Sequence, residues 1–180
     1  FAMVIVFFII INRLAKNVTL TLLTIINSTA FVYILVRALL GDSLQQYKDI
    51  YKYLTIIIGA SYLFLSQSFR NSWNSRLSEA LNLFGSIGLF GTAFSEIIDS
   101  VLWQMLYPIL VIAGFAYSIY AKSRSVLIIS TISLLSYVSY ITGEYFADSL
   151  GWPISLVILG FLFIGLGYMS VNINRKYIKQ

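Results

Sequence analysis

Four carboxylates are the residues of this chain best suited to chemistry, because they fall in pairs at the ends of two apolar runs. Glu96 and Asp99 are three residues apart and therefore share one face of a helix. Glu144 and Asp148 are four residues apart and follow a later run. Grouped carboxylates can hold a hard cation such as Ca²⁺ or share a proton. Solvated acids at a membrane surface would give the same pattern, and no Asp-x-Asp-x-Asp-Gly spacing occurs, so both interpretations stay open.

Arg37 is the most informative single charge, since it lies three residues before the end of an apolar run. A cation at that depth either extends its side chain toward the interface or pairs with an acid. Extension is the simpler interpretation. The sharper hypothesis is an ion pair that closes the outer end of a helix bundle. Its candidate acids are Glu96, Asp99 and Glu144.

Pro108 also lies inside an apolar run, and it has no backbone N–H to donate to the carbonyl of Gln104. This carbonyl and the Gln104 side-chain amide are therefore available to a solute, to water or to a neighbouring helix. Because neighbouring helices commonly take up such groups, we favour a structural role. The functional alternative is a polar pathway or gate formed by Arg37, Glu96, Asp99, Gln104 and Glu144.

The residue types that most enzymes need are missing from these 180 residues, which contain neither His nor Cys. Axial haem histidines, the usual zinc sites, His-based triads and thiol redox chemistry are thereby excluded. Phosphate loops, serine-hydrolase elbows and the Gly-x-Gly-Asp of intramembrane aspartyl proteases are also absent. We therefore expect no cofactor, no metal ion and no enzymatic activity. Acid or base catalysis by Glu96, Asp99 or Glu144 is the least supported alternative.

The composition of the chain restricts the kind of fold that positions these residues. Charged residues make up 11% of the chain and hydrophobic residues 59%, with a mean hydropathy of +0.85. A soluble domain carries about 25% charged residues, because it needs a solvated shell. The sequence therefore excludes a soluble globular domain, a disordered tail, a disulfide scaffold and a collagen-like fibre. It predicts an all-α, polytopic transmembrane helix bundle.

Long apolar runs give the predicted spans, since a hydrocarbon core about 30 Å thick needs about 20 helical residues. The runs are apolar on every face, which favours helices over a barrel. They predict about seven spans in a single helical domain that covers residues 1–180, and the first is truncated. The ranges are 1–11, 18–40, 53–69, 77–98, 101–121, 126–142 and 152–173. Because the first is half a span, we expect the chain to begin inside a helix of a longer protein; the alternative is a short re-entrant segment.

The longest connection, residues 41–52, leaves two interpretations open. Leu44, Tyr47, Tyr51 and Leu54 fall on one helical face. The segment either forms a short helix on the outer membrane surface or extends the next span.

Loop charge predicts the orientation, because Lys and Arg mark the cytoplasmic side. The loops on one side of the membrane contain basic residues and a single acid, Glu79. The loops on the other side are acidic. The basic set is Arg13, Lys16, Arg70, Arg76, Lys122, Arg124, Arg175, Lys176 and Lys179. The acidic side holds Asp42, Asp49, Glu96, Asp99, Glu144 and Asp148 against Arg37, Lys48 and Lys52. Seven alternating spans satisfy this division and place the C-terminus in the cytoplasm.

A stripe of small and polar residues runs down the predicted span 77–98 at alternating steps of three and four. Such a stripe lets a second membrane helix approach closely. We favour helix packing over a polar pathway that ends at the two acids of this helix. The packing residues are Asn82, Gly85, Gly88, Thr92 and Ser95. The span 126–142 repeats the pattern with Ser130, Ser133, Tyr137, Tyr140 and Glu144.

A loose, glycine-rich pattern occupies roughly the last 40 residues. It consists of Gly143-Glu144-Tyr145-Phe146, Leu150-Gly151-Trp152-Pro153, Gly160, Gly165-Leu166-Gly167-Tyr168 and Arg175-Lys176. This pattern resembles the end of a family of uncharacterised bacterial multi-pass membrane proteins of unknown function. The resemblance implies a bacterial inner (cytoplasmic) membrane location and a missing cytoplasmic N-terminal portion. It implies no catalytic residue.

These features predict a non-catalytic membrane-embedded bundle or subunit. It would pack with lipids, with partner subunits or copies of itself, or with a missing soluble region. The alternative is a small-solute or ion transporter or channel. Transport needs polar groups near the bilayer midplane, where this chain offers only Ser, Thr, Asn27 and Gly. Nucleic acid is not an expected partner, because the basic residues lie in short segments suited to anionic lipid headgroups.

Overall fold

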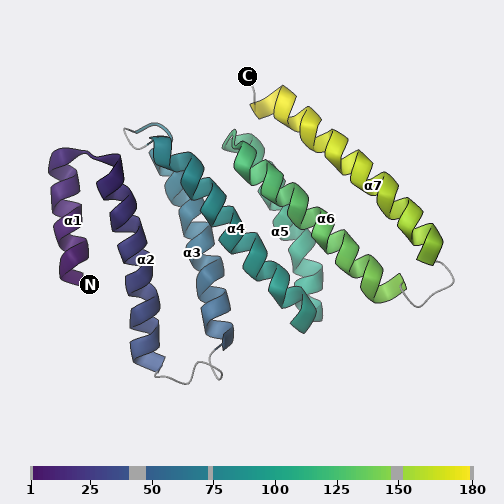
Figure 1. Cartoon of the computed structure of the whole chain (residues 1–180), viewed down its shortest axis with the longest axis horizontal. Helices are drawn as coiled ribbons and strands as arrows, with labels where there is room; N and C mark the ends of the chain where they lie inside the picture. Colours follow the sequence, from purple (N-terminus) through teal and green to yellow (C-terminus); the bar gives the residue numbers. More distant parts are fainter. Residues whose placement is uncertain (1, 41–47, 73–74, 147–151, 179–180) are drawn as a thin grey trace. The chain divides into compact units, whose positions relative to one another are not determined.

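The computed structural model describes residues 2–40, 48–72, 75–146 and 152–178, and every regular element in them is helical (Figure 1). The all-α prediction is confirmed for this part of the chain. The helices are α1 (Ala2–Ala15), α2 (Val18–Leu40), α3 (Lys48–Phe69), α4 (Ser75–Asp99), α5 (Val101–Tyr120), α6 (Arg124–Phe146) and α7 (Trp152–Ile173). A π-helical turn, Asn174–Ile178, continues α7. The chain folds into two compact units, Phe1–Gly85 and Ser86–Gln180.

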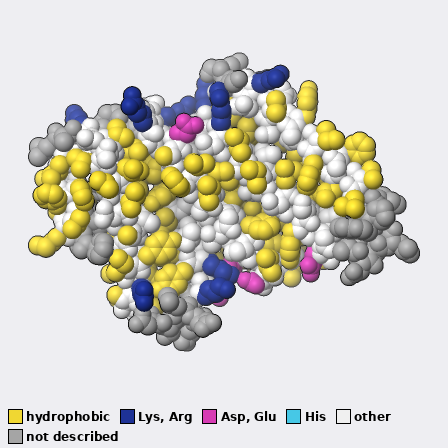
Figure 2. All heavy atoms as spheres, in the orientation of Figure 1, with side chains coloured by type: hydrophobic (Ala, Val, Ile, Leu, Met, Phe, Trp, Pro, Cys, Tyr) yellow, Lys and Arg dark blue, Asp and Glu magenta, His cyan; other side chains and the backbone are white. Residues whose placement is uncertain are grey.

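Five of these helices are long and apolar enough to cross a bilayer, namely α2, α4, α5, α6 and α7 with its π-helical turn. The protein is therefore an integral, multi-pass membrane protein. With 14 residues, α1 is shorter than a span. α3 has 22 residues, with Lys48, Asp49 and Lys52 near its start, and is not among the five. In Figure 2 hydrophobic side chains cover much of the visible surface, and the visible charges lie near helix ends.

Several helices extend beyond the predicted spans, and α3 and α6 illustrate the cause. α3 begins at Lys48 instead of residue 53, so Tyr51 and Leu54 belong to an extension of that helix. Leu44 and Tyr47 lie outside the described residues. α6 covers Arg124–Phe146 instead of 126–142, which places Glu144 on the helix. Both differences have one cause, because the helical backbone continues through charged side chains that hydropathy excludes from a span.

Polar side chains join consecutive helices of the first unit. Asn12 in α1 donates to the Thr21 hydroxyl of α2 over 2.8 Å. Farther along α2, the Thr29 and Tyr62 hydroxyls lie 2.6 Å apart and connect α2 to α3. Tyr33 and Thr55 make a second such contact of 2.7 Å. In a membrane such bonds stabilise helix pairs that share no hydrophobic driving force.

The contact between α3 and α4 combines hydroxyls with two glycines. The Ser66 hydroxyl donates to the Ser78 carbonyl over 2.8 Å, and the two hydroxyls lie 2.8 Å apart. Farther along both helices, a Cβ at Gly85 would lie 2.8 Å from the Gly59 carbonyl oxygen and 2.9 Å from Tyr62 Cβ. The two backbones approach this closely only because Gly85 has no side chain.

The core of the second unit lies where α4, α5 and α6 meet. Side chains from all three helices are at most 2% exposed there: Phe90, Ala93, Ile97, Tyr107, Val111, Val126 and Leu127. α5 approaches the other two helices at Gly114, where a Cβ would collide with the Phe90 ring and lie 2.6 Å from the Ser130 hydroxyl. In contrast, α7 contacts α6 through Thr131, whose hydroxyl donates to that of Ser170 over 3.1 Å.

Two fully buried serines provide a matched test of these contacts, since Ser66 is 1% and Ser130 is 0% exposed. Ser66 bonds to Ser78, whereas the Ser130 hydroxyl has no hydrogen-bond partner among the described residues. We expect Ser66→Ala to lower the free energy of unfolding by about 1 kcal/mol. Ser130→Ala should leave it unchanged or raise it, because a desolvated hydroxyl is removed. Unfolding in mixed dodecylmaltoside–SDS micelles, followed by circular dichroism, measures both. A larger loss for Ser130→Ala would contradict the assignment.

Candidate functional site

The Gln104 side chain in α5 bonds to two other helices of the second unit, α4 and α6. Its side-chain amide N–H donates to the Ile97 carbonyl of α4 over 3.2 Å. Its side-chain oxygen accepts from the Tyr145 hydroxyl of α6 over 2.9 Å. One half-buried amide therefore connects three membrane helices.

The backbone carbonyl of Gln104 has a partner from α6. It accepts a hydrogen bond from the Tyr137 hydroxyl over 2.8 Å. This is the carbonyl that would receive the N–H of residue 108 in a regular helix, and Pro108 has no N–H. A tyrosine of the neighbouring helix thus replaces the missing donor.

Aromatic rings surround this junction and fix its geometry. The rings of Tyr107 and Tyr137 lie 5.7 Å apart, tilted by 34°. Phe94 makes edge contacts with Tyr107 at 5.8 Å and with Tyr140 at 6.3 Å. Separations of this size are favourable for aromatic pairs, and α4, α5 and α6 each contribute at least one ring. The Tyr107 hydroxyl donates to the Phe90 carbonyl over 3.4 Å.

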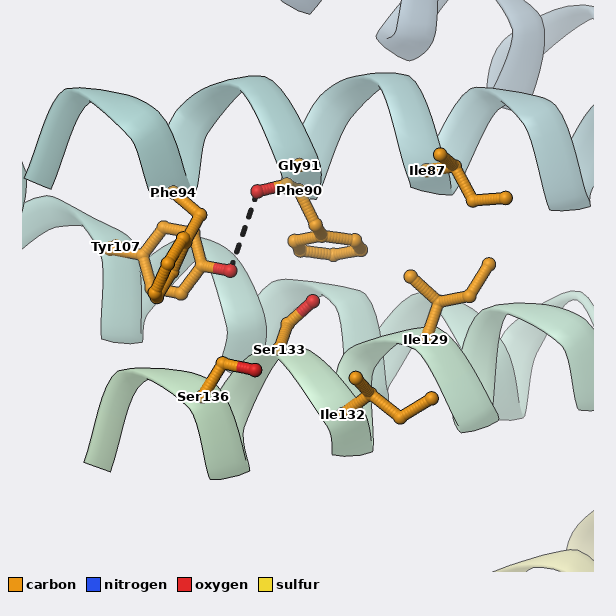
Figure 3. Close-up of a pocket in the computed structure, with 9 residues that line it drawn as sticks. All are labelled: Ile87, Phe90, Gly91, Phe94, Tyr107, Ile129, Ile132, Ser133 and Ser136. Carbon is orange, nitrogen blue, oxygen red and sulfur yellow. Dashed lines mark hydrogen bonds between the residues drawn. The ribbon is translucent and has the colours of Figure 1, made fainter. Parts of the chain in front are cut away.

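A pocket of about 360 Å³ lies beside the aromatic rings, between α4 and α6 (Figure 3). Phe90 and Phe94 line it from α4, and Tyr107 contributes from α5. Ser133 and Ser136 face it from α6. No charged side chain is among the described residues that line it. Its size falls in the range of small-molecule sites.

The predicted acidic residues lie in different environments. Glu96 is buried, at 5% exposure, whereas Asp99 and Glu144 are exposed. Asp148 lies outside the described residues. Within the described part of the chain, no group of three acids, histidines or cysteines could hold a metal ion.

Two of these acids neighbour the partners of Gln104 in sequence. Glu96 precedes Ile97, whose carbonyl accepts from the Gln104 amide. Glu144 precedes Tyr145, whose hydroxyl donates to the Gln104 side-chain oxygen.

Arg37 is exposed near the end of α2, in the first unit. The three acids predicted as its partners lie in the second unit. The ion pair therefore stays a prediction. The complete predicted pathway, Arg37 with Glu96, Asp99, Gln104 and Glu144, stays one as well.

The predicted packing stripe of α4 is divided between two surroundings. Asn82 and Gly85 are buried, and Gly85 lies against α3. Gly88, Thr92 and Ser95 are only half-buried, and the Ser95 hydroxyl donates to the Thr92 carbonyl of its own helix over 2.7 Å. In this half of α4 the deepest residues are instead Phe90, Ala93 and Ile97.

The sequence did not reveal the residues that line the pocket from α4 and α5, namely Ile87, Phe90, Gly91, Phe94 and Tyr107. It did not reveal Ser136 either. One signal was present, because Tyr107 directly precedes Pro108 in an apolar run and a buried phenol needs a hydrogen-bond partner. The phenylalanines carried no signal, since ring contacts depend on the register between helices.

Comparison of the chain with protein-family models, with curated proteins and with solved structures finds no match. The residues and their geometry are therefore the basis for assigning a function.

Proposed function

We propose that this protein is a non-catalytic, membrane-embedded subunit with about seven spans, whose polar residues hold its own helices together and whose α7 packs against a partner helix. α7 is the observation that supports the proposal most directly. It is among the apolar candidate spans, yet none of its most apolar stretch is buried within the chain. The corresponding stretch of α4 is 50% buried.

The surface of α7 has the shape that a second helix needs. A hollow of about 380 Å³ lies on α7 around Gly165 and is lined by Phe161, Leu162 and Met169, among others. A Cβ at Gly165 would meet no atom within 4 Å. At Gly85 the same kind of residue allows α3 and α4 to touch. Small residues serve this purpose widely in membrane helices, which supports a partner helix at Gly165.

The polar groups of the spans support a structural role over transport. The Thr24, Asn27 and Thr131 side chains donate to carbonyls of their own helices over 2.7 to 2.8 Å. The Gln104 amide and carbonyl bond to α4 and α6. Groups engaged in this way stabilise helices and offer little to a passing solute.

The native mass of the full-length protein tests the proposal, after gentle extraction from its own membrane and identification of what co-purifies. We expect a stoichiometric assembly that Gly165→Leu disrupts, because the leucine fills the hollow. Gly143→Leu is the matched control, since a Cβ at Gly143 also meets no atom within 4 Å. That variant should keep the assembly. A lone protomer, or an assembly that Gly165→Leu leaves intact, would refute the partner surface.

A further inference from the structure

The pocket between α4 and α6 has two chemically different ends (Figure 3). Hydroxyls gather at one end, from Tyr107, Ser133 and Ser136. The other end is aliphatic, with Ile87, Ile129 and Ile132. A pocket that served only as a packing defect would need no such division. The division matches a molecule with one polar end and an aliphatic body.

The pocket opens toward the surroundings of the spans. Ile87 is 51% exposed and Ile132 is 57% exposed, so the aliphatic end is accessible. Gly91 lies on the pocket wall, and a Cβ there would meet no atom within 4 Å. α4, α5 and α6 are all candidate membrane spans, so the medium at this opening is the bilayer. A ligand would therefore enter from the lipid.

The lining excludes a charged ligand. None of the described residues that line the pocket is charged, and an unpaired ion in a membrane span costs several kcal/mol. The hydroxyls suit a neutral oxygen. Ser133 is 8% exposed and lines the pocket together with Tyr107, whose hydroxyl donates to the Phe90 carbonyl over 3.4 Å. A hydroxyl can donate and accept at once, so this pair can still bind a ligand oxygen.

The hydroxyls lie well inside their helices. Tyr107 is the seventh residue of α5, about 9 Å from its first residue at a rise of 1.5 Å per residue. Ser133 and Ser136 lie close to the middle of α6, Arg124–Phe146. A ligand oxygen at these hydroxyls would therefore lie inside the span, where a polar group needs a hydrogen-bond partner.

We propose that this pocket binds a neutral, lipid-soluble molecule that has an aliphatic chain and one hydrogen-bonding oxygen, of the class of long-chain alcohols. Tyr107, Ser133 and Ser136 bind the oxygen, and the isoleucine end holds the chain. The hollow on α7 has about the same volume and offers no hydroxyl, so it provides an internal comparison that contacts chains without selecting an oxygen. This proposal does not depend on the partner helix proposed for α7.

Photolabelling of the full chain in phosphatidylcholine nanodiscs tests the proposal. The probe is a hexadecanol derivative with a diazirine and an alkyne in its chain, and labelled peptides are identified by mass spectrometry. We expect saturable labelling of the α4 and α6 peptides that line the pocket. Hexadecanol should compete with the probe at a concentration about two- to tenfold lower than hexadecane, which corresponds to one hydrogen bond. Hexadecanol and hexadecane should compete for the labelling of α7 at similar concentrations.

Variants separate specific binding from contact with bulk lipid. Gly91→Leu fills the pocket and should abolish saturable labelling there, whereas Gly143→Leu should keep it. The double variant Ser133→Ala with Ser136→Ala keeps the space and removes two of the three hydroxyls, so the advantage of hexadecanol over hexadecane should shrink. Labelling that does not saturate, or that persists in Gly91→Leu, would overturn the site. Equal competition by both molecules in the unmodified protein would overturn the ligand class.

Discussion

Replacement of Gly85 by alanine is expected to lower the free energy of unfolding by about 1–3 kcal/mol, which is the usual cost of overpacking. The added Cβ would lie 2.8 Å from the Gly59 carbonyl oxygen and 2.9 Å from Tyr62 Cβ. Neither atom is the end of a flexible side chain, so relief requires α3 and α4 to separate. Their separation would also stretch the Ser66–Ser78 bonds. Gly85→Leu should cost more than Gly85→Ala.

Gly91 provides the control on the same helix. A Cβ at Gly91 meets no atom within 4 Å, and alanine has a higher helix propensity than glycine by about 1 kcal/mol. Gly91→Ala should therefore leave the free energy of unfolding unchanged or raise it. Both variants are compared by SDS titration in dodecylmaltoside micelles with circular dichroism as the signal. Equal effects of the two substitutions would mean that α3 and α4 do not touch at Gly85.

The small-residue stripe of α4 illustrates what the sequence could predict and what it could not. Alternating spacing predicted that this helix offers small residues to a neighbour, and Gly85 lies against the backbone of α3. The same spacing continued to Thr92 and Ser95, although the deepest residues of that part are Phe90, Ala93 and Ile97. A stripe on one helix says nothing of how many neighbours that helix has. α4 contributes residues to both units, which divide at Gly85 and Ser86.

Helix ends were predicted less well than helix centres. Hydropathy placed the start of one span at residue 53, because Lys48, Asp49 and Lys52 interrupt the apolar run. The backbone hydrogen bonds of α3 do not depend on apolar side chains, and the helix begins at Lys48. An acid in the first turn also interacts favourably with the helix dipole, which is the position of Asp49.

For the polar junction, the sequence predicted the unsatisfied group but could not predict its partner. Pro108 alone shows that the Gln104 carbonyl lacks a donor from its own helix. The donor, Tyr137, is 33 residues farther along the chain. Its identity depends on the register between α5 and α6, which the close approach at Gly114 helps to set. No local pattern in the sequence encodes that register.

Tyr137→Phe is expected to lower the free energy of unfolding by about 1–2 kcal/mol. Hydrogen bonds between membrane helices average about 0.6 kcal/mol, because their groups find other partners when the helices separate. The cost here should be higher, since the substitution leaves a carbonyl that proline has already deprived of its helical donor. The ring contact of Tyr137 with Tyr107 at 5.7 Å survives in phenylalanine. Tyr140→Phe is the control on the same helix, because the contact of Tyr140 with Phe94 involves the ring.

A double-mutant cycle with Pro108→Ala tests the proposed cause. Alanine restores an N–H at residue 108, which can donate to the Gln104 carbonyl within α5. In this background Tyr137→Phe should cost much less, with a coupling energy of about 1 kcal/mol measured by the same SDS titration. The same loss in both backgrounds would show that the Tyr137 hydroxyl stabilises the protein independently of the proline. A cost that depends on Pro108 means that this proline and this tyrosine form one structural unit, through which α5 holds α6.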